Sequence, residues 1–364
     1  MMLYRTSIKL PPRPSECIIF AMVVGFLFSW EDWADALWNQ CDGPAGVHQH
    51  LVFRRLPTIS SEMSLKRQTA LTEPICDRAV CWNIPVPTDP RQRLRGWGRR
   101  WAKLRGRLLE TRFEHAWTQV GLPRDRVDVL MYEPPEAVSD VAYRFAKAHA
   151  SRVWGPDDRA TEPVTLPVVY SFGGTVHQWR ALPPPPSSAK VLTLVAVSSG
   201  AASIPGHMAR MNFYERLQSE GLPLELFGRG LPTRLDSRGP VVCKSNALIP
   251  ARFCLVIENS DTDDRYVSEK LWDALVAWCV PIYFGSRALD RLIPPESFIR
   301  LPTLDNEGLK VVRAALADPE QYSRRLDAIA EARQRALGPL RMVEFLAQRI
   351  PVHGQAEMGG QRVC

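Results

Sequence analysis

The C-terminal half of this 364-residue chain predicts an α/β fold built on a doubly wound parallel sheet. The first observation is a set of short apolar, β-branched runs, at 190–199, 223–228, 252–257 and 281–285, which suit strands buried on both faces. The second is that segments with helical periodicity separate these runs. Strands that alternate with helices in this way indicate a parallel sheet of the doubly wound kind.

Each element has its own pattern along the chain. The run KVLTLVAVSS gives the first of these strands, the turn GAASIPGHM follows it, and a helix is expected through Tyr214 and Leu217. The helix at 268–279 carries one apolar stripe, formed by Leu271, Trp272, Leu275, Val276 and Cys279. Further helices are expected from Glu307 onward.

The N-terminal half is less regular, and the length of the chain predicts two domains. Residues 1–90 are poorly assignable, because their periodicity is weak. A short strand is expected at 127–132, ahead of the acidic, proline-rich stretch MYEPPEAVSD. The stretch ALPPPPSS at 181–188 is typical of a stiff polyproline linker. We therefore expect an N-terminal domain at 1–180, a C-terminal domain at 189–350 and a tail at 351–364.

The composition is that of a globular, basic protein. Hydrophobic residues make up 45% of the chain and charged residues 23%, which argues against extensive disorder, and the formal net charge is +7. A basic surplus favours anionic partners: nucleotide phosphates, lipid headgroups, lipopolysaccharide or nucleic acid. The net charge does not choose among them.

A helix with a strongly basic face is expected at 91–112. Its apolar stripe recurs at spacings of 3 and 4 and consists of Leu94, Trp97, Trp101, Leu104 and Leu108. Such a helix can make a peripheral contact with an anionic membrane. Alternatively it packs its stripe on the protein core with its arginines in solvent, and the sequence leaves both interpretations open.

The apolar run at 17–30 is shorter than the about 20 residues that a membrane-spanning helix needs. The favoured interpretation is a buried first strand and turn, and the alternative is a short membrane anchor. We expect a cytoplasmic protein, membrane-associated in the alternative case. Among the 8 cysteines, Cys254 and Cys279 lie in apolar runs and are expected in the core. No disulfide and no structural metal are expected.

Two loops of the C-terminal half follow strands at the edge where doubly wound sheets bind ligands. The first leads from the strand at 190–199 to Arg210. The second, ENSDTDDRYVSEK, follows the strand at 252–257. It supplies polar groups suited to a base, a ribose and a diphosphate, namely Glu258, Asn259, Tyr266, Glu269 and Lys270.

Ser268 and Lys270 lie where the second loop enters a helix. Ser268 is expected to cap that helix. A lysine in the first helical turn is unfavourable with the helix dipole, so an anion near Lys270 is the better explanation of its place, and a solvated lysine is the alternative.

The segment FCLVIENSDTDDRYVSEKLWDALVAWCVPIYFGS at 253–286 resembles the signature of glycosyltransferase family 10, the α-1,3-fucosyltransferases. That signature is an apolar strand, Glu-Asn, a variable loop, Tyr-Val-Thr/Ser-Glu-Lys-Leu, and an apolar helix ending in Pro-x-x-x-Gly. The following PPESFIRL, at 294–301, is similar to the family's pattern too. Weaker similarity extends back to Val127. The cysteine pairs of the animal members are missing, which favours a bacterial-type relative.

The resemblance implies a GT-B-like fold, with two Rossmann-like domains facing each other across a cleft and GDP-fucose held by the C-terminal one. It implies transfer with inversion in a single displacement, which needs a carboxylate to take the proton of the acceptor hydroxyl. In the family this base belongs to a short Glu-x-Pro or Glu-Asn motif after a strand of the N-terminal domain. Glu133 in MYEPPE matches that place, and Glu136 is the fallback.

The resemblance also assigns the donor-binding residues. Arg210 and Lys270 would stabilise the departing diphosphate, and a guanidinium can bind phosphate oxygens in a bidentate manner. Asn259, Tyr266 and Glu269 are the other donor-binding residues that it implies, with Glu269 on ribose or fucose hydroxyls.

Two residues of the same loop form a D-x-D pattern, Asp261 and Asp263, which in other glycosyltransferases holds a divalent ion. The pattern is very short and lies in the variable part of the signature. We therefore expect no cofactor and no required metal. Arg265 is expected to be a solvated surface arginine, and the alternative is that it assists donor binding beside Tyr266.

The resemblance thus implies an inverting fucosyltransferase with GDP-fucose as donor. Its acceptor is expected to be a glycan with N-acetylglucosamine or galactose, on a lipid-linked or cell-surface saccharide. One alternative is transfer from another nucleotide sugar, since a fold does not fix its substrate. The other is a non-catalytic protein that binds membranes or nucleic acid through 91–112, although we expect no nucleic-acid partner.

Overall fold

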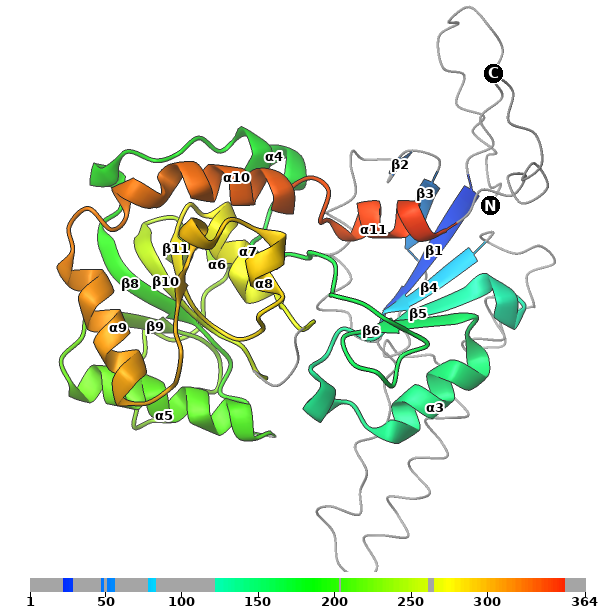
Figure 1. The fold of residues 1–364 in the computed structure, drawn as a ribbon, viewed down its shortest axis with the longest axis horizontal. Helices are drawn as coiled ribbons and strands as arrows, with labels where there is room; N and C mark the ends of the chain where they lie inside the picture. The colour runs from blue at the N-terminus through cyan, green and yellow to red at the C-terminus, as the bar shows by residue number, and fades with distance from the viewer. Residues whose placement is uncertain are drawn as a thin grey trace, which may run out of the picture.

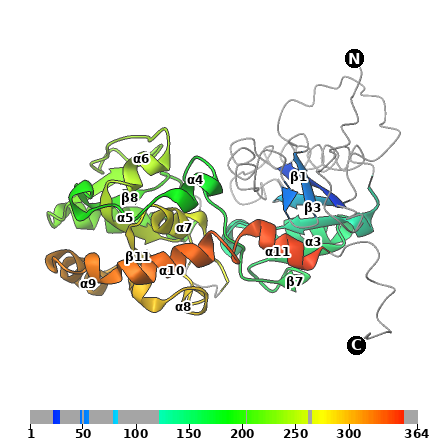
Figure 2. The same ribbon diagram turned by 90° about the horizontal axis from the view of Figure 1, so that it is seen from above.

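The structure, a computed structural model, describes residues 22–28, 47–48, 51–55, 78–82, 122–202, 204–260 and 265–350. These residues form two α/β domains, each built on its own sheet (Figure 1). Seen from above, the domains lie side by side (Figure 2). The expected basic helix at 91–112 and the tail at 351–364 lie outside the described residues.

The first domain contains a seven-stranded sheet in the order β2-β3-β1-β4-β5-β6-β7, parallel except for the β2–β3 pair. Its strands are β1 (Met22–Phe28), β2 (Val47–His48), β3 (Leu51–Arg55), β4 (Arg78–Trp82), β5 (Val127–Leu130), β6 (Arg152–Gly155) and β7 (Glu162–Pro163). The helix α3 (Asp140–His149) and the short 3₁₀ helices η2 (Arg124–Arg126) and η3 (Pro135–Ala137) lie in the same domain. A strand is therefore confirmed in the apolar run at 17–30.

Alternating side chains cover the two faces of this sheet differently. Cys81, Val129 and Val153 pack on one face with residues of α3. Trp82 and Trp154 point to the other face and pack with the last helix of the chain, α11 (Met342–Arg349). The two-residue period of a strand thus places one helix on each face, as Figure 1 shows.

The second domain contains a five-stranded, fully parallel sheet in the order β12-β11-β10-β8-β9. Its strands are β8 (Leu192–Val197), β9 (Leu224–Phe227), β10 (Ala251–Ile257), β11 (Val280–Phe284) and β12 (Ile299–Arg300). Its helices are α4 (Val176–Ala181), α5 (Pro205–Ser219), α6 (Lys244–Leu248), α7 (Glu269–Val276), α8 (Leu289–Leu292), α9 (Asn306–Ala317) and α10 (Leu326–Ala336), with the 3₁₀ helices η4 (Ser187–Ala189), η5 (Pro295–Ser297) and η6 (Ser323–Arg325). The strands and helices expected in this half are confirmed.

The chain crosses between the domains twice, and the crossings differ from the expected boundary at 181–188. Val168 donates its N–H to Leu340 O at 2.8 Å, and Met342 donates to Val168 O at 3.1 Å, so the two crossing segments pair with each other. The helix α4 precedes the proline stretch, yet its Val176 and Trp179 are buried in the core of the second domain. The linker residues therefore lie within the second domain, and α11 returns to the first.

A buried arginine fixes the helices beside the second crossing. Arg333 of α10 is 4% exposed, donates to Leu275 O at 3.1 Å, and also donates to Val276 O. Its other nitrogen donates to Trp179 O at 2.8 Å. These carbonyls lie at the ends of α7 and α4, and one buried cation serves as the partner for both helix ends.

Within the described part of the chain, no helix is long and apolar enough to cross a bilayer.

Candidate active site

The helix α5 begins directly after the turn that follows β8, and it holds Arg210 inside the protein. Pro205 stands in its first turn, where a missing N–H costs nothing. Gly206 lies so close to the backbone of Asn259 that a Cβ there would come within 2.0 Å of its carbonyl oxygen. This close approach brings the start of α5 against the loop after β10.

Arg210 is only 1% exposed and joins the two loops that follow β8 and β10. Its guanidinium donates to Asn259 Oδ1 and, at 3.2 Å, to Ser199 O. The Nε–H is buried with no hydrogen-bond partner among the described residues. A buried cation with one donor unused is suited to an anionic ligand.

The loop after β10 enters α7 through a network centred on Glu258. This carboxylate is 1% exposed and accepts hydrogen bonds from Ser268 N at 2.8 Å and Ser268 Oγ at 2.6 Å. Ser268 is the N-cap of α7, as expected, because its hydroxyl accepts from Lys270 N. Burial raises the pKa of Glu258 above its ordinary range, although Lys270 and the hydrogen bonds from Ser268 oppose the change.

Lys270 lies among carboxylates of the protein itself. Its Nζ is 3.0 Å from Ser268 Oγ, 3.6 Å from Glu258 Oε2 and 3.9 Å from Glu269 Oε1. The anion expected near this first-turn lysine is therefore supplied at least in part by Glu258 and Glu269. With its side chain 18% exposed, the ammonium still reaches the surface of the site.

A second lysine, Lys244 at the start of α6, completes the charge network. Its Nζ lies 3.3 Å from Glu269 Oε1 and 2.9 Å from Asp273 Oδ2, and Asp273 also accepts from Ser171 N and Ser171 Oγ, each at 2.9 Å. Burial alone would lower the pKa of Lys244, but the two carboxylates raise it. Burial alone would raise the pKa of Glu269, but Lys270 and Lys244 lower it to about 2. Glu269 is thus held ionised.

His207 is a buried imidazole close to the cations of the site. It lies one helical turn before Arg210 on α5 and is 8% exposed. Burial lowers the pKa of His207 to about 4, and the charges of Arg210 and Lys270 act in the same direction. The imidazole is therefore neutral near pH 7, and its two cationic neighbours, Arg210 and Lys270, come from different helices.

Glu133 reaches this network from the first domain. It follows β5, and its strongest charged neighbours are Glu269 and Lys270 of α7. Burial raises the pKa of Glu133 above its ordinary range, Glu269 raises it further, and Lys270 opposes them. A carboxylate with a raised pKa is a better proton acceptor than an exposed one.

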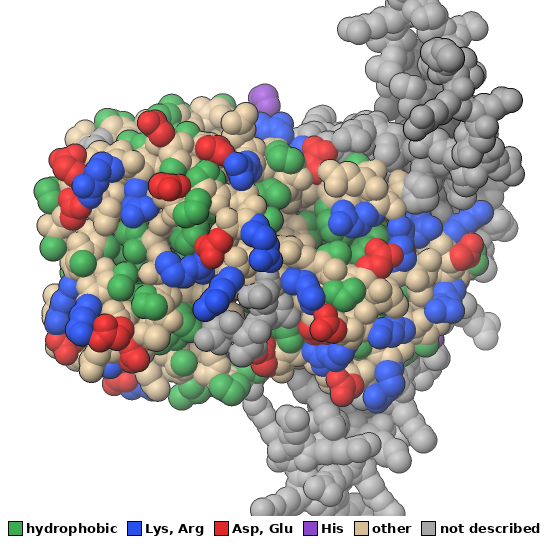
Figure 3. Space-filling view, viewed as in Figure 1, with side chains coloured by type: hydrophobic (Ala, Val, Ile, Leu, Met, Phe, Trp, Pro, Cys, Tyr) green, Lys and Arg blue, Asp and Glu red, His purple; other side chains and the backbone are tan. Residues whose placement is uncertain are grey.

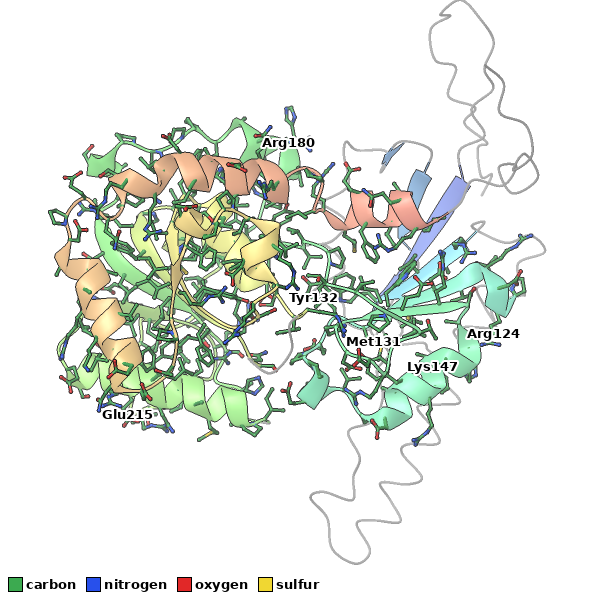
Figure 4. The ribbon with its side chains drawn as sticks, viewed as in Figure 1. Arg124, Met131, Tyr132, Lys147, Arg180 and Glu215 are labelled. Atoms are coloured by element: carbon green, nitrogen blue, oxygen red, sulfur yellow. The ribbon has the colours of Figure 1, made fainter. Side chains whose placement is uncertain are left out.

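Aromatic residues, among them Tyr132 directly before Glu133, pack at the junction between the domains. Tyr132 stacks on Trp82 with ring centroids 4.4 Å apart and donates its hydroxyl to Pro167 O at 3.2 Å. Tyr132 lies where the two domains meet, as Figure 4 shows. Tyr266 is 3% exposed and packs in the same cluster, so its ring contacts the first domain although its chain neighbours belong to the second.

Two further contacts join the loop after β10 to the first domain. Ser260 Oγ donates to Glu136 Oε1 at 2.7 Å. Arg265 donates to Pro156 O at 3.0 Å and to Asp158 Oδ1 at 2.9 Å, so this arginine, expected to be solvated, holds the domains together. On the face shown in Figure 3, several Lys and Arg side chains lie near the junction, interspersed with acidic ones.

The structure brings the expected site residues together in two groups. Arg210 and Asn259 bond directly, and Glu133, Glu269 and Lys270 are electrostatic neighbours. The D-x-D pattern lies outside the described residues. Among those that are described, no three His, Cys, Asp or Glu side chains gather in a way that could hold a metal ion.

Sequence reasoning missed Lys244, Asp273 and Ser171. A lysine in the first turn of a helix was the signal used for Lys270, and Lys244 opens α6 in the same manner. Asp273 carried a signal as well, because it is a carboxylate on the mostly apolar helix α7, where an ionised group requires a partner. Ser171 carried no local signal.

Comparison with known proteins shows which family the second domain is similar to. Residues 188–323 match the family described as Glycosyltransferase family 10 (fucosyltransferase) C-term. Alpha-(1,3)-fucosyltransferase C of Drosophila melanogaster is 40% identical over 109 residues, which are 29% of this chain and 25% of that protein. The 4-galactosyl-N-acetylglucosaminide 3-alpha-L-fucosyltransferase of Gorilla gorilla gorilla is 33% identical over 139 residues, 36% of each chain. The chain thus spans about a third or less of the length of these relatives.

A solved structure shows the fold over both domains. An alpha-glucosyltransferase in complex with UDP and a 13-mer DNA containing a central A:G mismatch matches with a TM-score of 0.52 and 8% identity, over 87% of this chain and 95% of that one. Together with the two mainly parallel sheets, this likeness confirms the GT-B-like architecture. Residues 188–323 are therefore similar to the C-terminal domain of the family 10 glycosyltransferases, as the signature at 253–301 implied.

Proposed function

We propose that this protein transfers fucose from GDP-fucose to a hydroxyl of a glycan. The observation that carries the proposal is the position of Glu133: this half-buried carboxylate of the first domain is an electrostatic neighbour of Lys270 in the second domain, and Lys270 belongs to the segment that matches the fucosyltransferases. The acceptor is a glycan that contains a galactosyl-N-acetylglucosamine unit, in keeping with the name of a relative.

Transfer proceeds by one displacement with inversion at the anomeric carbon. Glu133 takes the proton of the acceptor hydroxyl as the oxygen attacks, and the bond from the anomeric carbon to the diphosphate breaks. Arg210 and Lys270 stabilise the charge that develops on the leaving GDP. Asn259 orients Arg210, and Lys244 keeps Glu269 ionised to accept hydrogen bonds from hydroxyls of the donor. No divalent ion and no cofactor is required in this mechanism.

The test compares the wild-type protein with Glu133→Gln, using GDP-fucose and N-acetyllactosamine and following both GDP release and the fucosylated product. Removing the base is expected to lower kcat by about 10²- to 10⁴-fold while GDP binding stays unchanged. The matched control is Glu215→Gln on α5, an exposed residue labelled away from the junction in Figure 4, which is expected to retain full activity.

The pH dependence of transfer activity provides a second test of Glu133 as the base. Because the pKa of Glu133 is raised, wild-type activity is expected to fall as pH decreases through a value above the ordinary 4.5 of a glutamate. This acid limb should be missing in Glu133→Gln. Normal transfer by Glu133→Gln would refute the assignment of the base, and no transfer by the wild type to any galactose- or N-acetylglucosamine-containing acceptor would refute the function.

A further inference from the structure

We propose that Arg159, in the turn after β6, positions Glu133 for proton transfer by holding the loop at 133–138. The inference rests on the function proposed above, since it concerns the base of that reaction. It assigns a task to a residue that lies outside the donor-binding network and outside the family signature.

The contacts of Arg159 surround the short helix η3, which begins two residues after Glu133. The guanidinium donates to Pro135 O at 2.7 Å and to Val138 O at 2.8 Å, one at each end of η3. Backbone carbonyls are its partners here, so the arginine fixes the path of the loop whatever side chains the loop carries. The guanidinium also stacks 4.7 Å from the ring centroid of Tyr143 on α3.

All N–H donors of this guanidinium are used. Nε donates to Asp157 Oδ1 at 3.1 Å, Nη1 donates to Asp140 Oδ1 at 3.0 Å as well as to Val138 O, and Nη2 donates to Asp157 Oδ2 at 2.7 Å as well as to Pro135 O. An arginine side chain has five N–H donors, and each has an acceptor here. No donor is left for a substrate, which makes Arg159 a positioning residue rather than a binding one.

The same turn also holds the donor-binding loop of the other domain. Pro156 O and Asp158 accept hydrogen bonds from Arg265, which directly precedes Tyr266. The held loop in turn reaches across the junction, because Glu136 of η3 accepts from Ser260. The turn at 156–159 is thus bonded to the loop that carries the base and to the loop that enters α7. It sets the distance between proton acceptor and leaving group.

The decisive variant is Arg159→Lys, because a lysine keeps the charge but cannot donate to five acceptors arranged around a planar group. We expect kcat to fall about 10- to 100-fold, the usual cost of a misplaced catalytic group, with the Kd for GDP unchanged. The matched control is Arg124→Lys. Arg124 donates to Lys147 O and Ala150 O at the far end of α3, away from the junction (Figure 4), and its replacement should leave kcat unchanged.

A titration of the Glu133 carboxyl group tests the positioning role of Arg159 independently of turnover. The ¹³C carboxyl signal of Glu133 is identified by its loss in Glu133→Gln. In the wild type it should titrate above the ordinary range, and in Arg159→Lys its pKa should move down toward the ordinary value as the loop moves into solvent. Asp157→Asn, which weakens the hold on Arg159 without removing it, should show a smaller shift in the same direction and covers the case that Arg159→Lys does not fold.

Three results are distinguishable. An unchanged Glu133 titration in both Arg159→Lys and Asp157→Asn overturns the positioning role, whatever the enzyme transfers. The positioning role is also overturned if Arg159→Lys loses GDP affinity by the same factor as kcat, or if its loss of thermal stability accounts for the whole loss of kcat. A general structural role of Arg159 would then explain both results. If the wild type transfers no fucose but the titration shifts as expected, the proposed reaction fails and the positioning of Glu133 by Arg159 stands.

Discussion

The two domains share a sheet architecture but contribute to the site in different ways. The second domain holds its charges in a network around two buried carboxylates, Glu258 and Asp273, which pair with the half-buried Lys270 and Lys244; the half-buried Glu269 pairs with both lysines. The first domain sends one carboxylate, Glu133, on a loop held from outside the site by Arg159. The donor side is therefore preorganised by ion pairs, while the acceptor side depends on the placement of a loop. Binding and chemistry should be separable by mutation.

The largest effect is expected from removing Lys244, which tests whether ion pairing holds the donor side together. Lys244→Met leaves the buried Asp273 and the half-buried Glu269 without this cation, and breaking a buried pair typically costs about 3–5 kcal/mol. The free energy of unfolding should fall by an amount of that order at pH 7. The control is Lys310→Met, because Lys310 pairs with Glu307 on the surface and should cost less than about 1 kcal/mol.

The pH dependence of this variant has a definite sign. In the wild type the pKa of Glu269 is lowered to about 2, so the ionised group contributes stability above its ordinary pKa of 4.5, and the contribution is lost as pH falls toward 2. Without Lys244 that contribution shrinks. The difference in unfolding free energy between wild type and Lys244→Met should therefore be largest near pH 7 and smaller at pH 4. A difference that is constant over this range would show that packing, not ion pairing, stabilises the donor side.

A smaller effect is expected from Arg210→Lys, which sharpens the comparison by weakening donor binding alone. Lysine cannot bond Asn259 and Ser199 while also presenting a second donor to a phosphate. GDP affinity, measured by calorimetric titration, should fall about 10- to 100-fold. Arg216→Lys, at a partly exposed position on the same helix, is the control and should bind GDP normally. Equal losses of GDP affinity in Arg210→Lys and Glu133→Gln would contradict the separation of binding from chemistry.

Sequence alone predicted the second domain well, because its elements are patterned locally. The strands at 190–199 and 252–257 are apolar on both faces, and α7 shows its stripe and its serine cap within one short segment. The domain boundary was misplaced for a physical reason. Consecutive prolines stiffen a chain whether or not it links domains, whereas the true crossings are short segments whose pairing, Val168 with Leu340 and Met342, joins residues far apart in sequence.

The candidate site likewise contains residues that the sequence predicted and residues that it did not predict. Arg210, Asn259, Glu269 and Lys270 lie on loops that a doubly wound sheet brings to one edge, and a general rule of that fold locates them. No such rule locates Arg159 and Arg265. Their roles come from hydrogen bonds to backbone carbonyls at 135, 138 and 156, and a carbonyl position has no sequence signature. What remained hidden was the contact between domains, which no local pattern encodes.

The smallest expected effect concerns divalent ions, and it tests whether fixed cations alone serve the donor side. Transfer of fucose measured with excess EDTA should match that without it, because Arg210 and Lys270 already supply two positive charges where the diphosphate leaves. Asp261→Ala with Asp263→Ala should likewise keep its activity. Loss of transfer in EDTA, restored by Mg²⁺ or Mn²⁺ in the wild type but not in the double variant, would instead make these two aspartates metal ligands. The donor side would then resemble the acceptor side, since both would depend on the placement of a loop.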